Sequence, residues 1–153
     1  MKTLIVINDA PYGTERAYNA LRLAGAVAQQ QGQQVRVFLV GDASACAQTG
    51  QHVPNGYYNM ETMLTNVVRR GGEIGACGTC MDARGITEDR LVQGTRRSSL
   101  DEWAQWTIDA DKVVTSRAVV IDRNGSGGAE TLLGMAFDPY PAPSAPITLY
   151  LAY

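Results

Sequence analysis

The first forty residues alternate between two kinds of apolar pattern. Residues 4–7 are an uninterrupted run of aliphatic side chains, which is typical of a strand buried on both faces of a sheet. From about residue 14 to 31 apolar side chains recur at helical spacing, and residues 35–40 form a second β-prone run. A strand, a helix and a strand in this order are the repeating unit of a parallel sheet. The pattern therefore predicts an α/β fold with a mainly parallel sheet.

The same rhythm continues toward residue 116. Asn59 is suited to cap a helix whose apolar stripe ends at Gly71 and Gly72. Four of the further expected elements are a strand at 73–77, a short helix at 86–92, a brief strand or loop at 93–97 and a strand at 112–115. Between the last two, Ser99 and Glu102 match a capping box that starts a helix ending near residue 110. The sequence thus predicts about five strands with helices on both faces of the sheet.

The character of the chain changes after residue 116. Residues 117–122 could extend the last strand, but the β–α rhythm does not continue beyond them. Four of the six prolines lie between residues 139 and 146. We interpret residues 1–116 as one α/β domain and residues 117–153 as a C-terminal extension. An added hairpin, an oligomer contact and a poorly ordered appendix all stay open for this extension.

Charge and cysteine content narrow the function classes. The net charge is −2, and Arg96 and Arg97 are interpreted as a solvated basic pair, so no footprint for nucleic acid is present. The run of four apolar residues near the N-terminus is shorter than a signal-peptide core of about 7–15 residues or a membrane span of about 18. We therefore expect a cytoplasmic protein without a membrane partner. The three cysteines, Cys46, Cys77 and Cys80, are an odd number, which favours reactive or buried thiols over a disulfide framework.

The stretch with the clearest chemical content carries Cys77 and Cys80 in a C-x-x-C arrangement. Cys77 stands at the end of an expected strand, and parallel sheets bind their ligands at that edge. If a helix opens after it, free backbone N–H groups favour the thiolate and lower the thiol pKa. Gly78 would let another group approach closely, while Arg84 could add positive charge and Asp82 could orient Arg84 or a partner. We interpret this stretch as a reactive-thiol site.

Other candidates carry weaker signals. Asn8 and Tyr12 follow the first strand, so they lie at the same sheet edge and could hydrogen-bond a sulfur or a ligand; turn formation alone also favours such residues. His52 would form a nucleophile–base pair only if folding brought it to a cysteine. Zinc normally takes four ligands, and one C-x-x-C pair with Cys46 and His52 is a poor match. We therefore predict no metal and no cofactor.

The segment around the cysteines is more specific than C-x-x-C alone. It reads Cys-Gly-Thr-Cys-Met-Asp-Ala-Arg-Gly-Ile over residues 77–86. Five further segments support one likeness: residues 8–13, 21–24, 37–43, 104–107 and 110–115. With these residues the chain resembles the DsrE/DsrF-like family of small sulfur-relay proteins, and within it the YchN-like branch. The likeness covers about residues 1–116 in order.

The resemblance implies a three-layer α/β/α fold with a parallel sheet, assembled as a homotrimer or as a hexamer of paired trimers. In the sulfur-carrying members one cysteine accepts sulfane sulfur as a persulfide and passes it to a partner protein. That cysteine precedes Arg-Gly by six intervening residues, a spacing that Cys77 satisfies and Cys80 does not. The resemblance thus assigns the sulfur-acceptor role to Cys77, with sulfur donor and acceptor proteins as partners. Cys80 is an additional thiol that many sulfur-carrying relatives lack.

We therefore expect a small sulfur-relay protein that carries a persulfide on Cys77. Asp82, Arg84 and the backbone around Gly78 would hold and polarise the adduct. Two alternatives stay open. One is a thiol–disulfide redox protein in which Cys77 and Cys80 cycle together, because a neighbouring thiol can attack a persulfide or form a disulfide. The other is a non-enzymatic oligomeric binding module whose thiols are buried.

Overall fold

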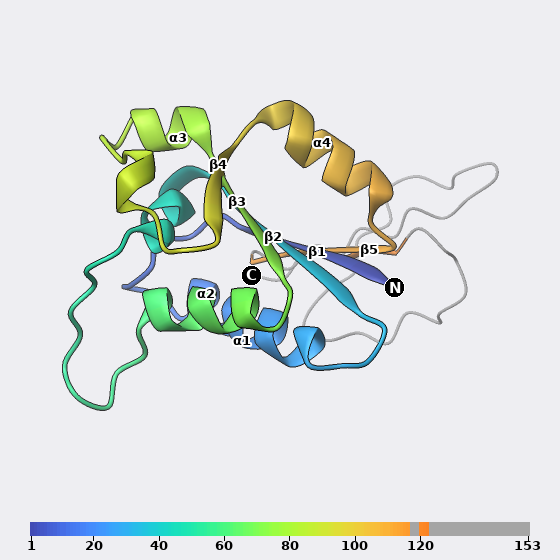
Figure 1. Ribbon diagram of the computed structural model, residues 1–153, viewed down its shortest axis with the longest axis horizontal. Helices are drawn as coiled ribbons and strands as arrows, with labels where there is room; N and C mark the ends of the chain where they lie inside the picture. The colour runs from blue at the N-terminus through green and yellow to red at the C-terminus, as the bar shows by residue number, and fades with distance from the viewer. Residues whose placement is uncertain (117–119, 123–153) are drawn as a thin grey trace.

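A computed structural model describes residues 1–116 and 120–122 of the chain. Its elements follow one another as β1 (Lys2–Ile7), α1 (Arg16–Ala28), β2 (Gln34–Leu39), the 3₁₀ helix η1 (Gly41–Ala47), α2 (Met60–Arg69), β3 (Glu73–Cys77), α3 (Gly78–Asp82), the 3₁₀ turn η2 (Glu88–Arg90), β4 (Thr95–Ser98), α4 (Leu100–Asp109), β5 (Lys112–Thr115) and β6 (Val120–Asp122). Helices α1 and α2 cover one face of the sheet and α4 lies on the other, while α3 stands at the carboxyl end of β3 (Figure 1). The predicted α/β fold with helices on both faces is confirmed.

The sheet has the strand order β4-β3-β2-β1-β5-β6. Its first five members in that order pair in parallel, as the sequence predicts. Strand β6 pairs antiparallel with β5, so residues 120–122 turn back along β5 instead of extending it. The other residues of the predicted extension, 117–119 and 123–153, lie outside the described part of the chain.

Two apolar cores follow from the alternation of side chains along the buried strands. In β1, Ile5 and Ile7 pack into the core under α1 and α2, whereas Leu4 and Val6 face the α4 side. The core on the α4 side is centred on Phe38, whose ring stacks on Trp103 at 5.0 Å and meets Trp106 edge-on at 6.1 Å. Burial of each large side chain contributes about 1.5–3 kcal/mol, so both faces of the sheet are stabilised.

The two predicted helix caps are formed. The side chain of Asn59 accepts a hydrogen bond from the Thr62 N–H at 2.9 Å, and that of Ser99 accepts one from the Glu102 N–H at 3.2 Å. The Glu102 carboxylate instead accepts hydrogen bonds from Arg96 and Ser98. The reciprocal half of the expected capping box is therefore replaced by contacts to β4.

The predicted short helix at 86–92 is wrong. The helical residues lie earlier, in α3, and only the single turn η2 forms within that range. Gly85, with φ of +62°, is the third residue after the end of α3 and completes the turn that follows it. Leu91 then forms a backbone bridge with Gln48, and the Val92 N–H donates to the Ala47 carbonyl, so the chain there is extended.

Within the described ranges none of the helices has the length and hydropathy to cross a bilayer.

Candidate active site

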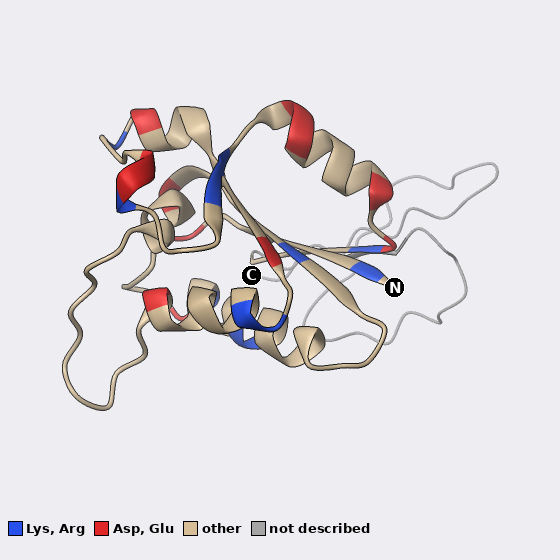
Figure 2. Ribbon diagram, in the orientation of Figure 1, with Lys and Arg blue, Asp and Glu red and all other residues tan. Residues whose placement is uncertain are grey.

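The carboxyl ends of the five parallel strands lie at one edge of the sheet. Cys77 is the last residue of β3, and α3 begins at the next residue, so Cys77 occupies the N-cap position of that helix. Cys80 lies one turn later, within α3. Charged residues of both signs surround α3, η2 and the neighbouring end of β4 (Figure 2). The predicted C-x-x-C stretch is thus a strand-to-helix junction at this edge.

The sulfur of Cys77 is half-buried and surrounded by hydrogen-bond donors. The side chain packs against the α4-side core, whose partly buried members include Val40 and Trp103. Its Sγ lies 3.4 Å from Thr79 Oγ1. Burial opposes ionisation of Cys77, but hydrogen bonds from the side chains and backbone N–H groups of Cys80 and Thr79 outweigh it and lower its pKa. Cys77 is therefore the thiol of the pair that ionises more readily.

Cys80 has the opposite character. Burial raises the pKa of its thiol, and its hydrogen bond to Cys77 and the negative charge there raise it further. The Gly41 N–H donates to Cys80 Sγ at 3.2 Å, and this contact together with the charge of Arg84 opposes the rise. Cys80 is thus the thiol of the pair that ionises less readily, and its sulfur accepts a hydrogen bond from the first residue of η1.

Arg84 lies on the Cys80 side of the helix. One guanidinium nitrogen donates to the Cys80 carbonyl at 2.9 Å, and the other pairs with Asp42 at 2.6 Å. The carbonyl is one of those left unpaired at the end of a short helix, so Arg84 satisfies it. The ion pair joins α3 to η1, which follows β2.

Asp82 does not orient Arg84, in contrast to one of the two roles expected for it. It forms a two-point ion pair with Arg97, at 2.7 Å for both N–O contacts. Arg97 belongs to β4, next to β3 in the sheet, and the hydrogen bonds from Arg97 lower the pKa of the Asp82 carboxyl. Arg97 is exposed, as the sequence predicts for a solvated basic pair, but its side chain is also fixed against α3 by Asp82. Sequence alone offered one signal for it, the position at a strand end.

The two predicted residues after β1 lie in different surroundings. Asn8 adjoins η1, because its carbonyl oxygen is 3.8 Å from the point where a Cβ of Gly41 would stand. Asn8 is therefore a neighbour of Gly41, whose N–H donates to the sulfur of Cys80. Tyr12 donates to Gln51 at 2.6 Å and its ring faces Tyr58, so its recorded contacts hold the loop before α2.

The remaining candidates are placed as follows. Cys46 is fully buried in the α1–α2 core, and burial raises the pKa of its thiol to about 12. His52 is exposed in the loop after η1. Among the described residues, no group of three or more His, Cys, Asp or Glu side chains is arranged to hold a metal ion.

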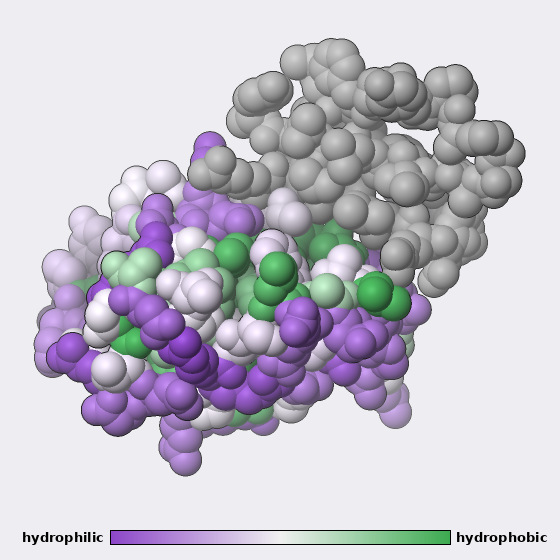
Figure 3. All heavy atoms as spheres, turned by 90° about the horizontal axis from the view of Figure 1, so that it is seen from above, coloured by the Kyte–Doolittle hydropathy of each residue, from purple (hydrophilic) through white to green (hydrophobic). Residues whose placement is uncertain are grey.

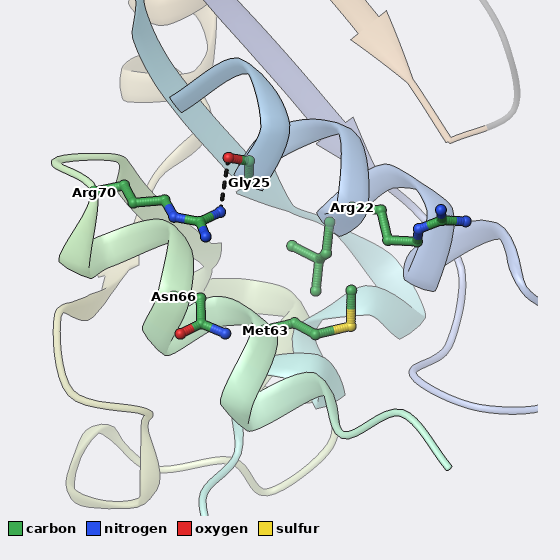
Figure 4. Close-up of a pocket in the computed structure, with 6 residues that line it drawn as sticks. Arg22, Gly25, Met63, Asn66 and Arg70 are labelled. Atoms are coloured by element: carbon green, nitrogen blue, oxygen red, sulfur yellow. Dashed lines mark hydrogen bonds between the residues drawn. The ribbon is translucent and has the colours of Figure 1, made fainter. Parts of the chain in front are cut away.

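A shallow pocket lies on the other helical face, between α1 and α2 (Figure 4). Arg22, Met63 and Asn66 are among its lining residues. Arg70 reaches across it and donates to the Gly25 carbonyl at 2.9 Å, so this guanidinium braces the two helices. The pocket contains no thiol, and we assign no chemistry to it.

Comparison with known proteins agrees with the resemblance noted from the sequence. Residues 1–116 match the DsrE/DsrF-like family. Protein YchN of Escherichia coli (strain K12) is 42% identical over 115 residues, which cover 74% of this chain and 97% of YchN. Uncharacterised protein MK0008 of Methanopyrus kandleri is 36% identical over 110 residues, which cover 72% of this chain and 89% of that protein.

Two solved structures have the same fold. The crystal structure of YchN from E. coli superposes with a TM-score of 0.71 at 42% identity, covering 74% of this chain and 97% of YchN. MTH1491 from Methanobacterium thermoautotrophicum, a protein of unknown function, superposes with a TM-score of 0.60 at 11% identity, covering 74% of this chain and 97% of its own. The second likeness concerns the fold alone.

Proposed function

This chain belongs to the DsrE/DsrF-like family, and from that membership and the geometry of its thiol pair we propose that it carries sulfane sulfur as a persulfide on Cys77. The observation that supports this most directly is the unequal pair of thiols. Cys77 receives hydrogen bonds that favour its thiolate, whereas Cys80 is held as the protonated neighbour. A thiolate is the nucleophilic form of cysteine, so Cys77 is the attacking group.

The proposed transfer needs no oxidant. The Cys77 thiolate attacks the outer sulfur of a donor persulfide, R–S–SH. A new S–S bond forms at Cys77 while the S–S bond of the donor breaks, and its electron pair leaves on R–S⁻. Delivery is the reverse reaction with an acceptor thiolate, in which Cys77 departs as a thiolate. The donors around Cys77 assist both steps, because a lowered thiol pKa also makes a better leaving group.

The further predicted residues keep specific places in this proposal. Gly78, Asp82 and Arg84 lie next to the thiols. Asn8 lies next to Gly41 of η1, so in this proposal it supports the segment that contacts Cys80. The contacts of Tyr12 give it a loop-holding role, so its part in binding a partner stays a prediction. The three free thiols suit a reducing compartment.

We propose that the chain acts as a homotrimer or hexamer that meets separate sulfur donor and acceptor proteins. Helix α4 exposes two large apolar side chains, Leu100 at 72% and Ile108 at 62%. The surface on the α3–α4 side of the molecule carries green apolar patches bordered by purple polar residues (Figure 3). Exposed apolar area of this kind is typical of protein–protein contacts.

Intact-protein mass after incubation with a sulfane-sulfur donor tests the proposal. The mass should rise by about 32 Da for each sulfur atom bound. Cys77→Ser should abolish the gain, whereas Cys80→Ser and the buried-thiol control Cys46→Ser should retain it. A gain that survives Cys77→Ser and disappears with Cys80→Ser would assign the sulfur to the wrong thiol and refute the proposal.

A second candidate function is thiol–disulfide exchange, favoured by the mutual influence of the two thiols, which lowers the pKa of Cys77 and raises that of Cys80. In this reaction the mass would fall by two hydrogens per chain, and both cysteines would be required. The binding-module alternative makes a third prediction: native titration would find no accessible thiol of low pKa. The same protein sample therefore separates all three.

A further inference from the structure

The guanidinium of Arg97 lies directly against the residue that follows Cys77. A Cβ placed on Gly78 would stand 2.8 Å from Arg97 Nε, 2.9 Å from Cζ and 3.0 Å from Nη2. Such distances are too short for any side chain at position 78 unless the guanidinium moves. Strand register explains the approach, because β4 pairs with β3 so that Ser98 stands opposite Cys77, and Arg97 precedes Ser98. Glycine at position 78 thus provides the space that this arginine occupies.

The carboxylate of Asp82 binds the two terminal nitrogens of the Arg97 guanidinium and fixes its position. It accepts one hydrogen bond from Nη1 and one from Nη2, both at 2.7 Å. A guanidinium has five N–H donors, and this pair uses two of them. Among the described residues Asp82 accepts both hydrogen bonds that the Arg97 guanidinium donates, so three of its N–H groups remain for a ligand. The side chain is therefore positioned and still exposed to solvent.

Arg84 cannot serve Cys77 in the same way. Its guanidinium is bound to the Cys80 carbonyl and to Asp42, on the side of α3 that faces η1. The two arginines near the thiols therefore belong to different cysteines, and Arg97 is the one next to the Cys77 peptide.

We propose that Arg97 holds the anionic outer sulfur of a Cys77 persulfide, which rests on the proposed sulfur-carrying function. When Cys77–S–SH ionises, its proton leaves to water and the negative charge moves to the outer sulfur, one S–S bond of about 2 Å beyond Sγ. The site already holds hydrogen-bond donors for Sγ itself, from Thr79 and Cys80. Arg97 supplies a cation and unpaired N–H donors next to Thr79 and Cys80. These can pair with the negative charge on the outer sulfur of the persulfide.

The charge of Cys77 also acts on Arg97. Its hydrogen bonds to Asp82 raise the pKa of Arg97 most, burial opposes the rise, and the charges of Asp82, Glu88 and Cys77 add to it. The guanidinium thus stays charged throughout the reaction, and its function is to stabilise an anion without exchanging a proton.

The test measures how readily the outer sulfur ionises. Wild-type protein is loaded with sodium tetrasulfide, and alkylation of the Cys77 persulfide by iodoacetamide is followed by mass spectrometry across a pH series. On the acidic limb of the profile Arg97→Met should alkylate about three- to tenfold more slowly than wild type, because a nearby charge shifts ionisation by that order. Arg97→Lys should recover most of the rate. Arg69→Met, at the exposed end of α2, should match wild type.

A second variant keeps the arginine and moves it. Gly78→Ala places a methyl group against the flexible end of the Arg97 side chain, so the guanidinium must shift while the fold remains. This variant should reproduce the slower acidic limb of Arg97→Met. If wild type gains sulfur but both variants titrate as it does, the role of Arg97 is refuted while the sulfur-carrying function stands. If wild type gains no sulfur on Cys77, both proposals fail.

Discussion

Removal of the Cys80 thiol should make Cys77 a weaker nucleophile near neutral pH. Cys80 provides the largest of the hydrogen-bond effects that lower the Cys77 pKa, followed by the Thr79 hydroxyl and the two backbone N–H groups. The substitution Cys80→Ala deletes the S–H donor and leaves the helix backbone in place. Because Cys46 is buried, the substitution leaves Cys77 as the remaining partly exposed thiol among the three cysteines.

The magnitude follows from the strength of one hydrogen bond. A hydrogen bond to a charged acceptor contributes about 1.5–3 kcal/mol, and a weak S–H donor to a half-exposed sulfur should fall below this range, at about 1 kcal/mol. One kcal/mol changes the ratio of thiolate to thiol by about fivefold. The lowered pKa of Cys77 makes thiolate available at lower pH, so loss of the donor moves its profile to higher pH. Below the pKa the alkylation rate should fall by about fivefold, and at high pH the two proteins should converge.

The assay is iodoacetamide alkylation across a pH series, with the modified cysteine located by fragment-ion mass spectrometry. Cys80→Ser keeps an O–H donor at the same place and should lose less rate than Cys80→Ala. Thr79→Val removes the next side-chain donor and should shift the profile in the same direction by a smaller amount. An unchanged Cys77 profile in Cys80→Ala would refute the account of the two thiols as donor and acceptor.

Two further predictions concern stability. Gly94→Ala should lower the urea-derived free energy of unfolding by about 1–3 kcal/mol more than Gly50→Ala. Both glycines have positive φ, at +86° and +77°, but a Cβ at Gly94 would lie 2.5 Å from Val68 Cγ1 while that at Gly50 meets open space; equal losses would contradict this. Arg96 holds the pKa of Glu102 below its ordinary value of 4.5, against the opposing effect of burial. The stability that this ion pair adds is present above pH 4.5 and is lost as pH falls through the folded-state pKa of Glu102. In urea unfolding midpoints measured across a pH series, Glu102→Gln should therefore lose less stability than wild type toward acid pH. Equal losses in the two proteins would contradict this.

Local pattern was sufficient for most of the fold. The aliphatic run of β1 predicts a strand buried on both faces because both cores require apolar side chains from it. Asn59 and Ser99 mark helix starts through contacts only three residues away, which are visible in sequence. The prediction failed at 86–92, where a backbone bridge from Leu91 to distant Gln48 overrides local helical preference.

Local sequence patterns did not predict the long-range contacts around the thiols. Arg97 reaches Gly78 only because β4 pairs with β3 in one register, and sequence does not determine that register. The donor from Gly41 to Cys80 likewise joins residues 39 positions apart. The donors of Cys77 itself are local in sequence, because Thr79 and Cys80 lie within three residues of it.

Helix α3 is too short to hold the two thiols in place by itself, since isolated helices below about 12–15 residues are marginal in water. Its fully buried Met81 anchors it in the α1–α2 core, while Cys77 packs on the opposite core. The ion pairs of Arg84 with Asp42 and of Asp82 with Arg97 are exposed, and water screens exposed ion pairs so that they add little to stability. Their main effect is therefore orientation: one ties the Cys80 side of α3 to the end of β2, and the other ties the Cys77 side to β4. The groups that lower the Cys77 pKa, Thr79 and Cys80, thus lie within the C-x-x-C segment itself, while the contacts to η1 and β4 hold that segment in place.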